Sequence, residues 1–281
     1  MRSHRLILLL LVAFGFLAST SAAKKPEIGV IVMAHGGTPL WNKTVTEVVK
    51  QADIPYPTRV FFGMAHTKEE VDQLQNDVTA LQNKGVHSIV VVPLLVSSYS
   101  EVYRQWRYLL GGDVNPGFNT GFFPIEKRVE VQFMDPLNDD PIVALIVLDR
   151  AREISQNPEQ ENVILVAHGP NDNSDNAKWL TMLWRISTTV RDRGHFRSVE
   201  GMTLRDDAPE EIRSQAVDAI RSRVETIDKE GGKALVIPLL IAPGGIENKI
   251  GVALKGLMYS LNAKVLLPDH RISQWIRSKV P

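Results

Sequence analysis

Two stretches, VIVMAHG at Val30–Gly36 and VILVAHG at Val163–Gly169, join a continuous apolar run to the same Ala-His-Gly ending. Short β-branched runs without polar alternation are typical of parallel strands buried on both faces. The two stretches lie 133 residues apart. They predict an α/β fold whose first strand occurs twice.

Two more segments repeat in the same order. FFGM at Phe61–Met64 corresponds to VEGM at Val199–Met202, and VVPLL at Val91–Leu95 corresponds to VIPLL at Val236–Leu240. The spacings of 138 and 145 residues drift slowly from the first, which indicates a duplicated unit rather than chance similarity.

Helical patterns lie between the predicted strands. An opening Thr67, followed by Glu70 and apolar residues on one face, predicts a helix after the second strand. We therefore expect two tandem, similar, doubly wound domains, each with a four-stranded parallel sheet flanked by helices. The remaining helices are expected at Thr38–Gln51, Glu101–Leu110, Ile142–Ile154, Ser174–Val190, Pro209–Lys229, Glu247–Ser260 and Ile272–Ser278, and the fourth strands at Val129–Phe133 and Lys264–Leu267, with the last helix closing each unit.

Composition narrows the class of function. The 281 residues include 32 Lys and Arg against 32 Asp and Glu, so no basic excess suggests a nucleic-acid partner. The absence of Cys excludes disulfides, thiolate metal sites and thiol nucleophiles. Small molecules or metal ions held by His, Asp or Glu are the expected partners.

The N-terminal residues have the pattern of an export signal. Arg2 and Arg5 precede the apolar run Leu6–Ala18, and small residues follow at Ser19–Ala23. We expect a signal peptide at 1–23, an N-terminal domain at 24–157 and a C-terminal domain at 158–281. The apolar run is too short for a typical membrane span, and an uncleaved anchor is the alternative. The predicted location is the periplasm or the exterior, with no stable membrane span after cleavage.

Candidate site residues follow the strands, because ligands of open α/β sheets bind beyond the carboxyl ends of the strands where strand order reverses. With the order 2-1-3-4, the loops after the first and third strands meet. These loops pair a His with a Glu in each half and contain glycines that let backbone amides approach a ligand. The residues are His35, Gly36, Gly37, Tyr99 and Glu101 in the first half, and His168, Gly244, Gly245 and Glu247 in the second.

The strand-Ala-His-Gly openings, the VVPLL strand and the segment Met134–Pro141 (MDPLNDDP) resemble the class II tetrapyrrole metal chelatases. The similar subgroup is the sirohydrochlorin cobaltochelatase and ferrochelatase type in its two-domain form, over approximately Ile28 to Ile276. The resemblance implies insertion of Co²⁺, Ni²⁺ or Fe²⁺ into a sirohydrochlorin- or porphyrin-like ring, with the metal as substrate and no organic cofactor. In that family a second His lies in the loop after the third strand, whereas neither half has one here.

Our hypothesis for the chemistry is a His and Glu site. His35 and Glu101 are the predicted catalytic residues and metal ligands, and His168 and Glu247 are the duplicate ligands. A neutral imidazole can bind a borderline divalent ion or accept a pyrrole proton. Gly36, Gly37, Tyr99, Arg104, Gly244 and Gly245 are the predicted substrate-binding residues, with Arg104 meeting acidic side chains of the ring.

Two other functions compete with the chelatase reading. One is a non-enzymatic periplasmic protein that binds metal or tetrapyrrole and derives from a chelatase. The other is a hydrolase, suggested by His35-Gly36-Gly37, but the Gly-x-Ser-x-Gly nucleophile turn that such enzymes need is absent from the sequence. His66, after the second strand, is a candidate supporting residue with Asp206 or Asp207 loosely opposite it in the second half.

Overall fold

Two parallel four-stranded sheets form the frame of the protein in the computed structural model, which describes residues 27–113 and 115–281. The predicted signal peptide at 1–23 lies outside the described residues. The strand orders are β2-β1-β3-β4 and β6-β5-β7-β8, so the predicted fold class and the 2-1-3-4 order are confirmed. The strands are β1 (Ile28–Ala34), β2 (Thr58–Phe62), β3 (Ser88–Pro93), β4 (Glu130–Phe133), β5 (Glu161–Ala167), β6 (Ser198–Thr203), β7 (Lys233–Leu239) and β8 (Ser260–Leu261).

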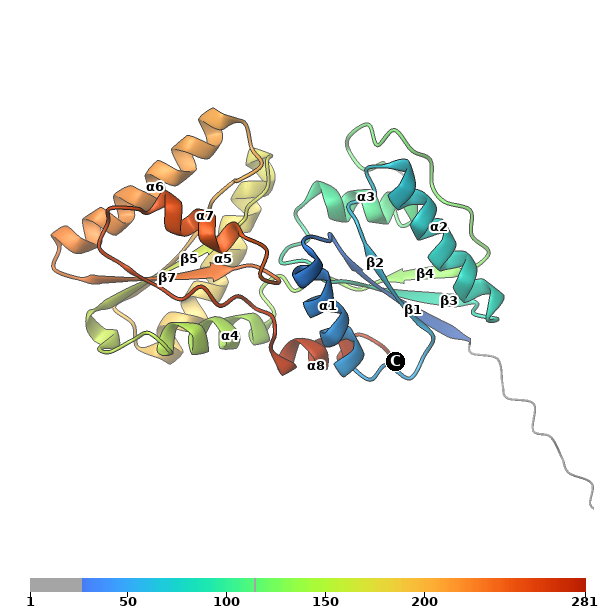
Figure 1. Ribbon diagram of the computed structural model, residues 1–281, viewed down its shortest axis with the longest axis horizontal. Helices are drawn as coiled ribbons and strands as arrows, with labels where there is room; N and C mark the ends of the chain where they lie inside the picture. The colour runs from blue at the N-terminus through green and yellow to red at the C-terminus, as the bar shows by residue number, and fades with distance from the viewer. Residues whose placement is uncertain (1–26, 114) are drawn as a thin grey trace, which may run out of the picture.

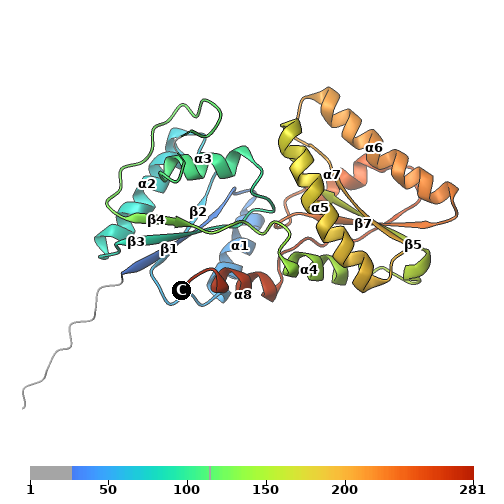
Figure 2. The ribbon, with the colours of Figure 1, turned by 180° about the vertical axis from the view of Figure 1, so that it is seen from behind.

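Helices cover both faces of each sheet (Figures 1 and 2). Polar side chains start several of them, since Thr38, Thr67 and Ser100 each accept a backbone N–H of the first turn. The helices are α1 (Pro39–Gln51), α2 (Lys68–Asn83), α3 (Glu101–Leu109), α4 (Pro141–Arg152), α5 (Asn173–Gly194), α6 (Glu210–Lys229), α7 (Ile246–Ala253) and α8 (His270–Ser278), with a short 3₁₀ turn η1 (Pro158–Gln160). No helix in the described part of the chain is both long and apolar enough to traverse a bilayer.

The two halves exchange their last helices, contrary to the expectation that each last helix closes its own unit. Helix α4 packs against α5 and β7 of the second sheet, and α8 returns to pack against α1 of the first (Figure 1). One buried apolar cluster consequently includes Val30 of β1, Val163 of β5, Ile146 of α4 and Ile276 of α8. The two sheets therefore share a core, and neither sheet is covered by its own half alone.

The fourth strand of the second half differs from the prediction. Ser260 and Leu261 pair with Leu235 and Val236, whereas the predicted strand was Lys264–Leu267. Leu266 and Leu267 still donate backbone hydrogen bonds, to Leu240 and Ile241 beyond the end of β7. The apolar run at 264–267 thus starts the crossing toward α8 instead of extending the sheet.

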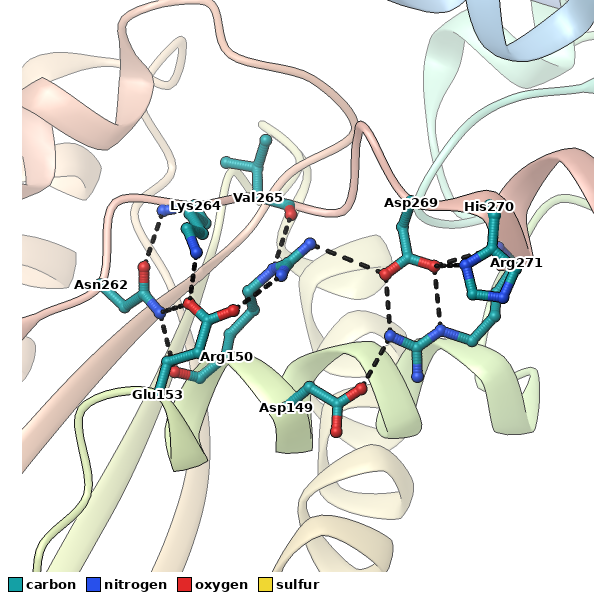
Figure 3. Close-up of polar contacts among 9 residues, drawn as sticks. All are labelled: Asp149, Arg150, Glu153, Asn262, Lys264, Val265, Asp269, His270 and Arg271. Atoms are coloured by element: carbon teal, nitrogen blue, oxygen red, sulfur yellow. Dashed lines mark hydrogen bonds and ion pairs between the residues drawn. The ribbon is translucent and has the colours of Figure 1, made fainter. Parts of the chain in front are cut away.

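The crossing segment is tied to the end of α4 by a polar network (Figure 3). Arg150 donates from Nε to the carbonyl of Val265 and from Nη1 to Glu153, and its Nη2 lies 3.7 Å from Asp269. Asp269 in turn accepts two hydrogen bonds from the guanidinium of Arg271. These contacts fix the place where the chain leaves the second sheet for the first.

Candidate functional site

The first strand of each sheet ends in the same local structure. His35 follows β1 and His168 follows β5, and the next residues, Gly36 and Gly169, have φ angles of 80° and 76°. Positive φ favours glycine, because a Cβ atom crowds the backbone there. In both halves the imidazole hydrogen-bonds to the backbone of the following glycine, with His168 Nδ1 lying 2.9 Å from the Gly169 carbonyl oxygen.

His35 lies within the electrostatic reach of His168 from the other half. Solvent reaches the His35 ring, yet protein surrounds most of it. Burial is the main cause that lowers the pKa of His35, and the charge of His168 lowers it further, while Asp207 opposes the shift. His35 is therefore held toward its neutral form, with His168 and Asp207 as electrostatic neighbours from the other half.

His168 has an acidic partner that the sequence analysis did not assign to it. Nε2 of His168 lies 3.4 Å from Oδ2 of Asp207, in the loop after β6. Among the described residues, one set of three His, Asp or Glu side chains brings its potential ligand atoms within 4.8 Å of one another, and it consists of His168, Asp206 and Asp207. The most compact acidic and imidazole group thus lies in the second half.

Trp41 joins the two halves beside His35. Its ring centroid lies 4.6 Å from that of His35, and Trp41 is 3% exposed. A Cβ atom added to Gly37 would lie 3.0 Å from Trp41, and one added to Gly244 would lie 3.1 Å from it. The absence of side chains at Gly37 and Gly244 therefore makes room for Trp41, and their predicted contact with substrate stays a prediction.

The two predicted glutamates occupy different surroundings. Glu101 begins α3 and is exposed, and its side chain makes no hydrogen bond or ion pair with the residues described. Glu247 accepts from the N–H groups of Gly245 and Gly244 at 3.0 and 3.4 Å. Neither belongs to the group around His168, and neither is among the charges that shift the pKa of His35. The structure thus gives His168 the acidic neighbour Asp207, and the expected pairing of each His with a Glu stays a prediction.

Two other predicted residues bridge the halves. Nη1 of Arg104 lies 2.8 Å from Oδ2 of the buried Asp175 at the start of α5. The carbonyl of Tyr99 accepts from Trp179 Nε1 at 2.7 Å, and Lys178 Nζ lies 5.4 Å from the centre of the Tyr99 ring. Part of the capacity of Arg104 to meet a ring carboxylate is thus used within the protein.

Arg205 is a site residue that sequence reasoning missed. It is 7% exposed, has a φ of 55°, and its backbone N–H donates to the His168 carbonyl at 2.7 Å. Its guanidinium donates to the carbonyls of Pro170 and Asn171 and to the side chain of Asn173. Arg205 therefore binds the loop after His168 to the loop that carries Asp207.

Sequence comparison finds a family similarity in the first half of the chain. The model of the CbiX family matches residues 29–154. Residues 29–154, somewhat less than half of the chain, are thus similar to the CbiX family. This confirms the expected resemblance to class II chelatases. No curated protein matches the chain in sequence.

Solved structures extend the likeness of fold to both halves. SirB from Bacillus subtilis, solved with Fe³⁺, has a TM-score of 0.65 at 17% identity, covering 90% of this chain and 94% of SirB. DR2241 from Deinococcus radiodurans, described as a multi-domain protein with structural similarity to chelatases, has a TM-score of 0.50 at 17% identity, covering 84% of this chain and 50% of DR2241. The part that matches the CbiX model and the half that follows it thus have the arrangement of a two-domain chelatase-like fold.

Proposed function

We propose that the protein inserts a divalent metal ion into a tetrapyrrole, with cobalt, nickel or iron as the metal and a sirohydrochlorin- or porphyrin-like ring as the acceptor. The observation that carries the proposal is the placement of His35, which follows the first strand of one sheet and whose pKa is lowered by burial and by the charge of His168, the residue that follows the first strand of the other sheet. The CbiX match and the chelatase fold support the same reaction class.

Metal insertion needs bases as well as ligands. Two pyrrole N–H protons must leave the ring while the ion exchanges its ligands for four ring nitrogens, so the ring gains the charge +2 of the ion and loses two protons. His35 suits the acceptance of one proton, because burial and His168 lower its pKa and keep its lone pair available at neutral pH. Solvent access at His35 gives the proton a route away from the site.

The test is spectrophotometric. Purified protein is mixed with Co²⁺ and sirohydrochlorin, and the rate of metallation is compared with the spontaneous rate. His35→Ala and His168→Ala should each lower the protein-dependent rate by at least about tenfold, as expected for loss of a general base or a ligand. His87→Ala is the matched control, since His87 is exposed and precedes β3 at the opposite edge of the sheet.

Two outcomes would remove the catalytic proposal. Rates no higher than the spontaneous reaction, with stoichiometric binding of ring or metal, would favour the alternative of a non-enzymatic binder. Equal rates for the wild type and both histidine variants would show that the paired histidines do not carry the reaction.

We further propose that the protein works outside the cytoplasm. The basic, apolar and small-residue order of residues 1–23 supports export. Fractionation of cells and N-terminal sequencing of the mature chain test this. A cytoplasmic protein that retains residue 1 would contradict it.

A further inference from the structure

We propose that Tyr99 of the first half and Lys178 of the second bind the tetrapyrrole together, with Tyr99 against the face of the ring and Lys178 at one of its carboxylate side chains. This inference rests on the proposed function, and it moves the recognition of ring carboxylates from the predicted Arg104 to Lys178. Lys178 thereby selects rings that carry acidic side chains.

The carboxylate of Asp175 holds Arg104 within the protein. Nη1 of Arg104 lies 2.8 Å from Oδ2 of Asp175, whose side chain is 5% exposed. A buried carboxylate that loses its cation is left uncompensated, which is strongly unfavourable. Drawing Arg104 toward a ligand would strip Asp175 of this cation, so the main effect of Arg104 is to hold the start of α5 against α3 (Figures 1 and 2).

Lys178 contacts the same carboxylate but is held loosely. Its Nζ lies 3.5 Å from Oδ1 of Asp175, at the limit of a hydrogen bond, and its side chain is 52% exposed. An exposed ion pair of this kind, one turn apart on a helix, contributes little to stability. Because an ammonium group has more than one N–H donor, Lys178 can bind a ligand carboxylate at small cost.

The neighbouring acidic side chains leave Lys178 available. Asp172, which precedes α5, accepts from the Ser174 hydroxyl at 2.7 Å and from the backbone N–H of Asp175 at 2.8 Å. A carboxylate at this position is stabilised by the N–H groups of the first helical turn. In the part of the chain that the structure describes, the side chain of Glu101 makes no ion pair with Lys178. The ammonium group therefore keeps donors for a ligand.

Tyr99 lies on a loop that is fixed from both halves. Its backbone N–H donates to Oγ of Ser97 at 3.1 Å, and its carbonyl accepts from Nε1 of Trp179 at 2.7 Å. The next backbone N–H along the loop, that of Ser98, donates to Asn138 at 2.8 Å. Tyr99 is nevertheless 38% exposed. An exposed aromatic side chain on a fixed backbone offers a flat ligand a rigid surface at little cost in entropy.

The two side chains meet across the boundary between the halves. Nζ of Lys178 lies 5.4 Å from the centre of the Tyr99 ring, within the range of a cation–π contact. In a tetrapyrrole, acidic side chains project from the rim of a flat, largely apolar ring. An exposed aromatic ring beside an ammonium group matches both features, because the first can stack on the ring and the second can form a charge-assisted hydrogen bond at its rim.

The pair lies at the same edge of the sheets as the histidines. Strand β3 pairs in parallel with β1, so the loop that carries Tyr99 leaves the sheet beside His35. Helix α5 carries Lys178 near its start and follows the loop after His168. A ring bound by Tyr99 and Lys178 therefore lies beyond the carboxyl ends of the strands, where ligands of open α/β sheets bind.

The experiment measures binding of a metal-free ring, so it requires no turnover. Uroporphyrin, whose side chains are all carboxylates, and its methyl ester, which has none, are titrated in the same solvent into the full-length mature protein, and the absorbance of the ring is followed. Lys178→Met should weaken binding of uroporphyrin by about tenfold, as expected for loss of one charge-assisted hydrogen bond, and should leave binding of the ester unchanged. Lys178→Arg should restore most of the affinity.

Lys229→Met is the matched control. The Lys229 side chain is 78% exposed at the end of α6, which precedes β7 and so lies at the opposite edge of the sheet. This variant should bind both rings as the wild type does.

Tyr99 variants test the contact with the face of the ring. Tyr99→Ala should weaken binding of uroporphyrin and of its ester alike, by about twofold to tenfold, because stacking does not depend on the carboxylates. Tyr99→Phe should retain both affinities. The contacts that fix the loop are made by the Tyr99 backbone, so neither change removes them, and circular dichroism checks the fold of each variant.

Unchanged binding of uroporphyrin in Lys178→Met, equal weakening of acid and ester in that variant, or unchanged binding of both rings in Tyr99→Ala would each overturn the assignment. Metallation with a KM for the ring that does not depend on Lys178 would defeat this inference and leave the proposed function standing. Binding of the ring through Lys178 and Tyr99 without metallation would do the reverse.

Discussion

Trp41 of the first half lies against Gly244 of the second, so closely that a Cβ atom at Gly244 would be 3.1 Å from Cδ1 of Trp41. Trp41 also contacts the candidate site, because the centre of its ring is 4.6 Å from the centre of the His35 ring. A larger side chain at position 244 should therefore displace the buried indole of Trp41 and, through it, the His35 ring.

Gly244→Val should destabilise the protein by about 1–3 kcal/mol, the usual cost of overpacking, and should slow metallation because Trp41 must shift beside His35. Urea unfolding and the metallation rate measure the two effects. Gly251→Ala is the control, since its Cβ atom would lie 3.8 Å from Leu261 and alanine favours a helix. If Gly244→Val and Gly251→Ala have the same free energy of unfolding, the contact of Trp41 with Gly244 does not join the halves.

The two glycines that follow the histidines should respond differently to alanine. Both have positive φ, which costs an L residue about 1–2 kcal/mol. At Gly169 the added Cβ atom would also lie 2.6 Å from Cβ of Thr203, whereas at Gly36 its nearest neighbour is 3.5 Å away. Gly169→Ala should therefore lower the free energy of unfolding by more than Gly36→Ala, by about 1 kcal/mol or more. If urea unfolding gives the same loss of free energy for both variants, the loop after His168 moves to relieve the clash with Thr203.

The sheets could be predicted from the sequence because buried parallel strands leave a local signal. Val30–Gly36 and its repeat at Val163–Gly169 show it directly. The exchange of α4 and α8 could not be predicted, since an apolar helix face indicates that a helix packs but not on which sheet. The six buried apolar side chains of α4 pack with α5 and β7 of the second sheet, and nothing in their spacing distinguishes that sheet from the first.

The sequence analysis placed Asp206 or Asp207 only loosely opposite His66, because its alignment of the repeat was shifted by three residues at the second strand. The sheet register pairs Phe62 with Ala34 and Thr203 with Ala167, so Phe62 corresponds to Thr203, whereas the sequence alignment matched Phe62 to Glu200. Counting four residues on from each gives His66 and Asp207. A Gly-Met pair shared by chance left the choice between Asp206 and Asp207 open, and the strand register selects Asp207.

The exchanged helix α8 should support both halves. Trp275 is 4% exposed and donates from Nε1 to Asp140 at the start of α4, 3.0 Å away. Trp275→Ala should cost about 3–5 kcal/mol, typical of a buried aromatic side chain, and the halves should still unfold in one transition because the cluster is shared. Trp184→Ala, at a 66% exposed tryptophan, should cost less than about 0.5 kcal/mol. Two separate transitions in Trp275→Ala, followed by circular dichroism in urea, would contradict the shared core.

Acid should weaken the crossing segment through Asp269. Burial alone would raise the pKa of Asp269, but hydrogen bonds from Arg271 and the charges of Arg271 and Arg150 outweigh burial and hold it below its ordinary value (Figure 3). A carboxyl group whose pKa is lower in the folded state binds fewer protons there than in the unfolded chain. Its stabilisation is complete above the unfolded pKa of about 3.9 and is lost as pH falls through the folded value.

Urea unfolding between pH 7 and pH 3 should therefore show a steeper loss of stability below about pH 4 in the wild type than in Asp269→Asn. The variant should also be less stable at pH 7, because it lacks the charge that faces Arg271 and Arg150 and keeps only an amide at the start of α8. Asp72→Asn, at an exposed carboxylate on α2, should give a profile parallel to the wild type. If Asp269→Asn and the wild type lose stability in parallel below pH 4, the ionised Asp269 does not stabilise the crossing, and the exchange of α8 depends on apolar packing alone.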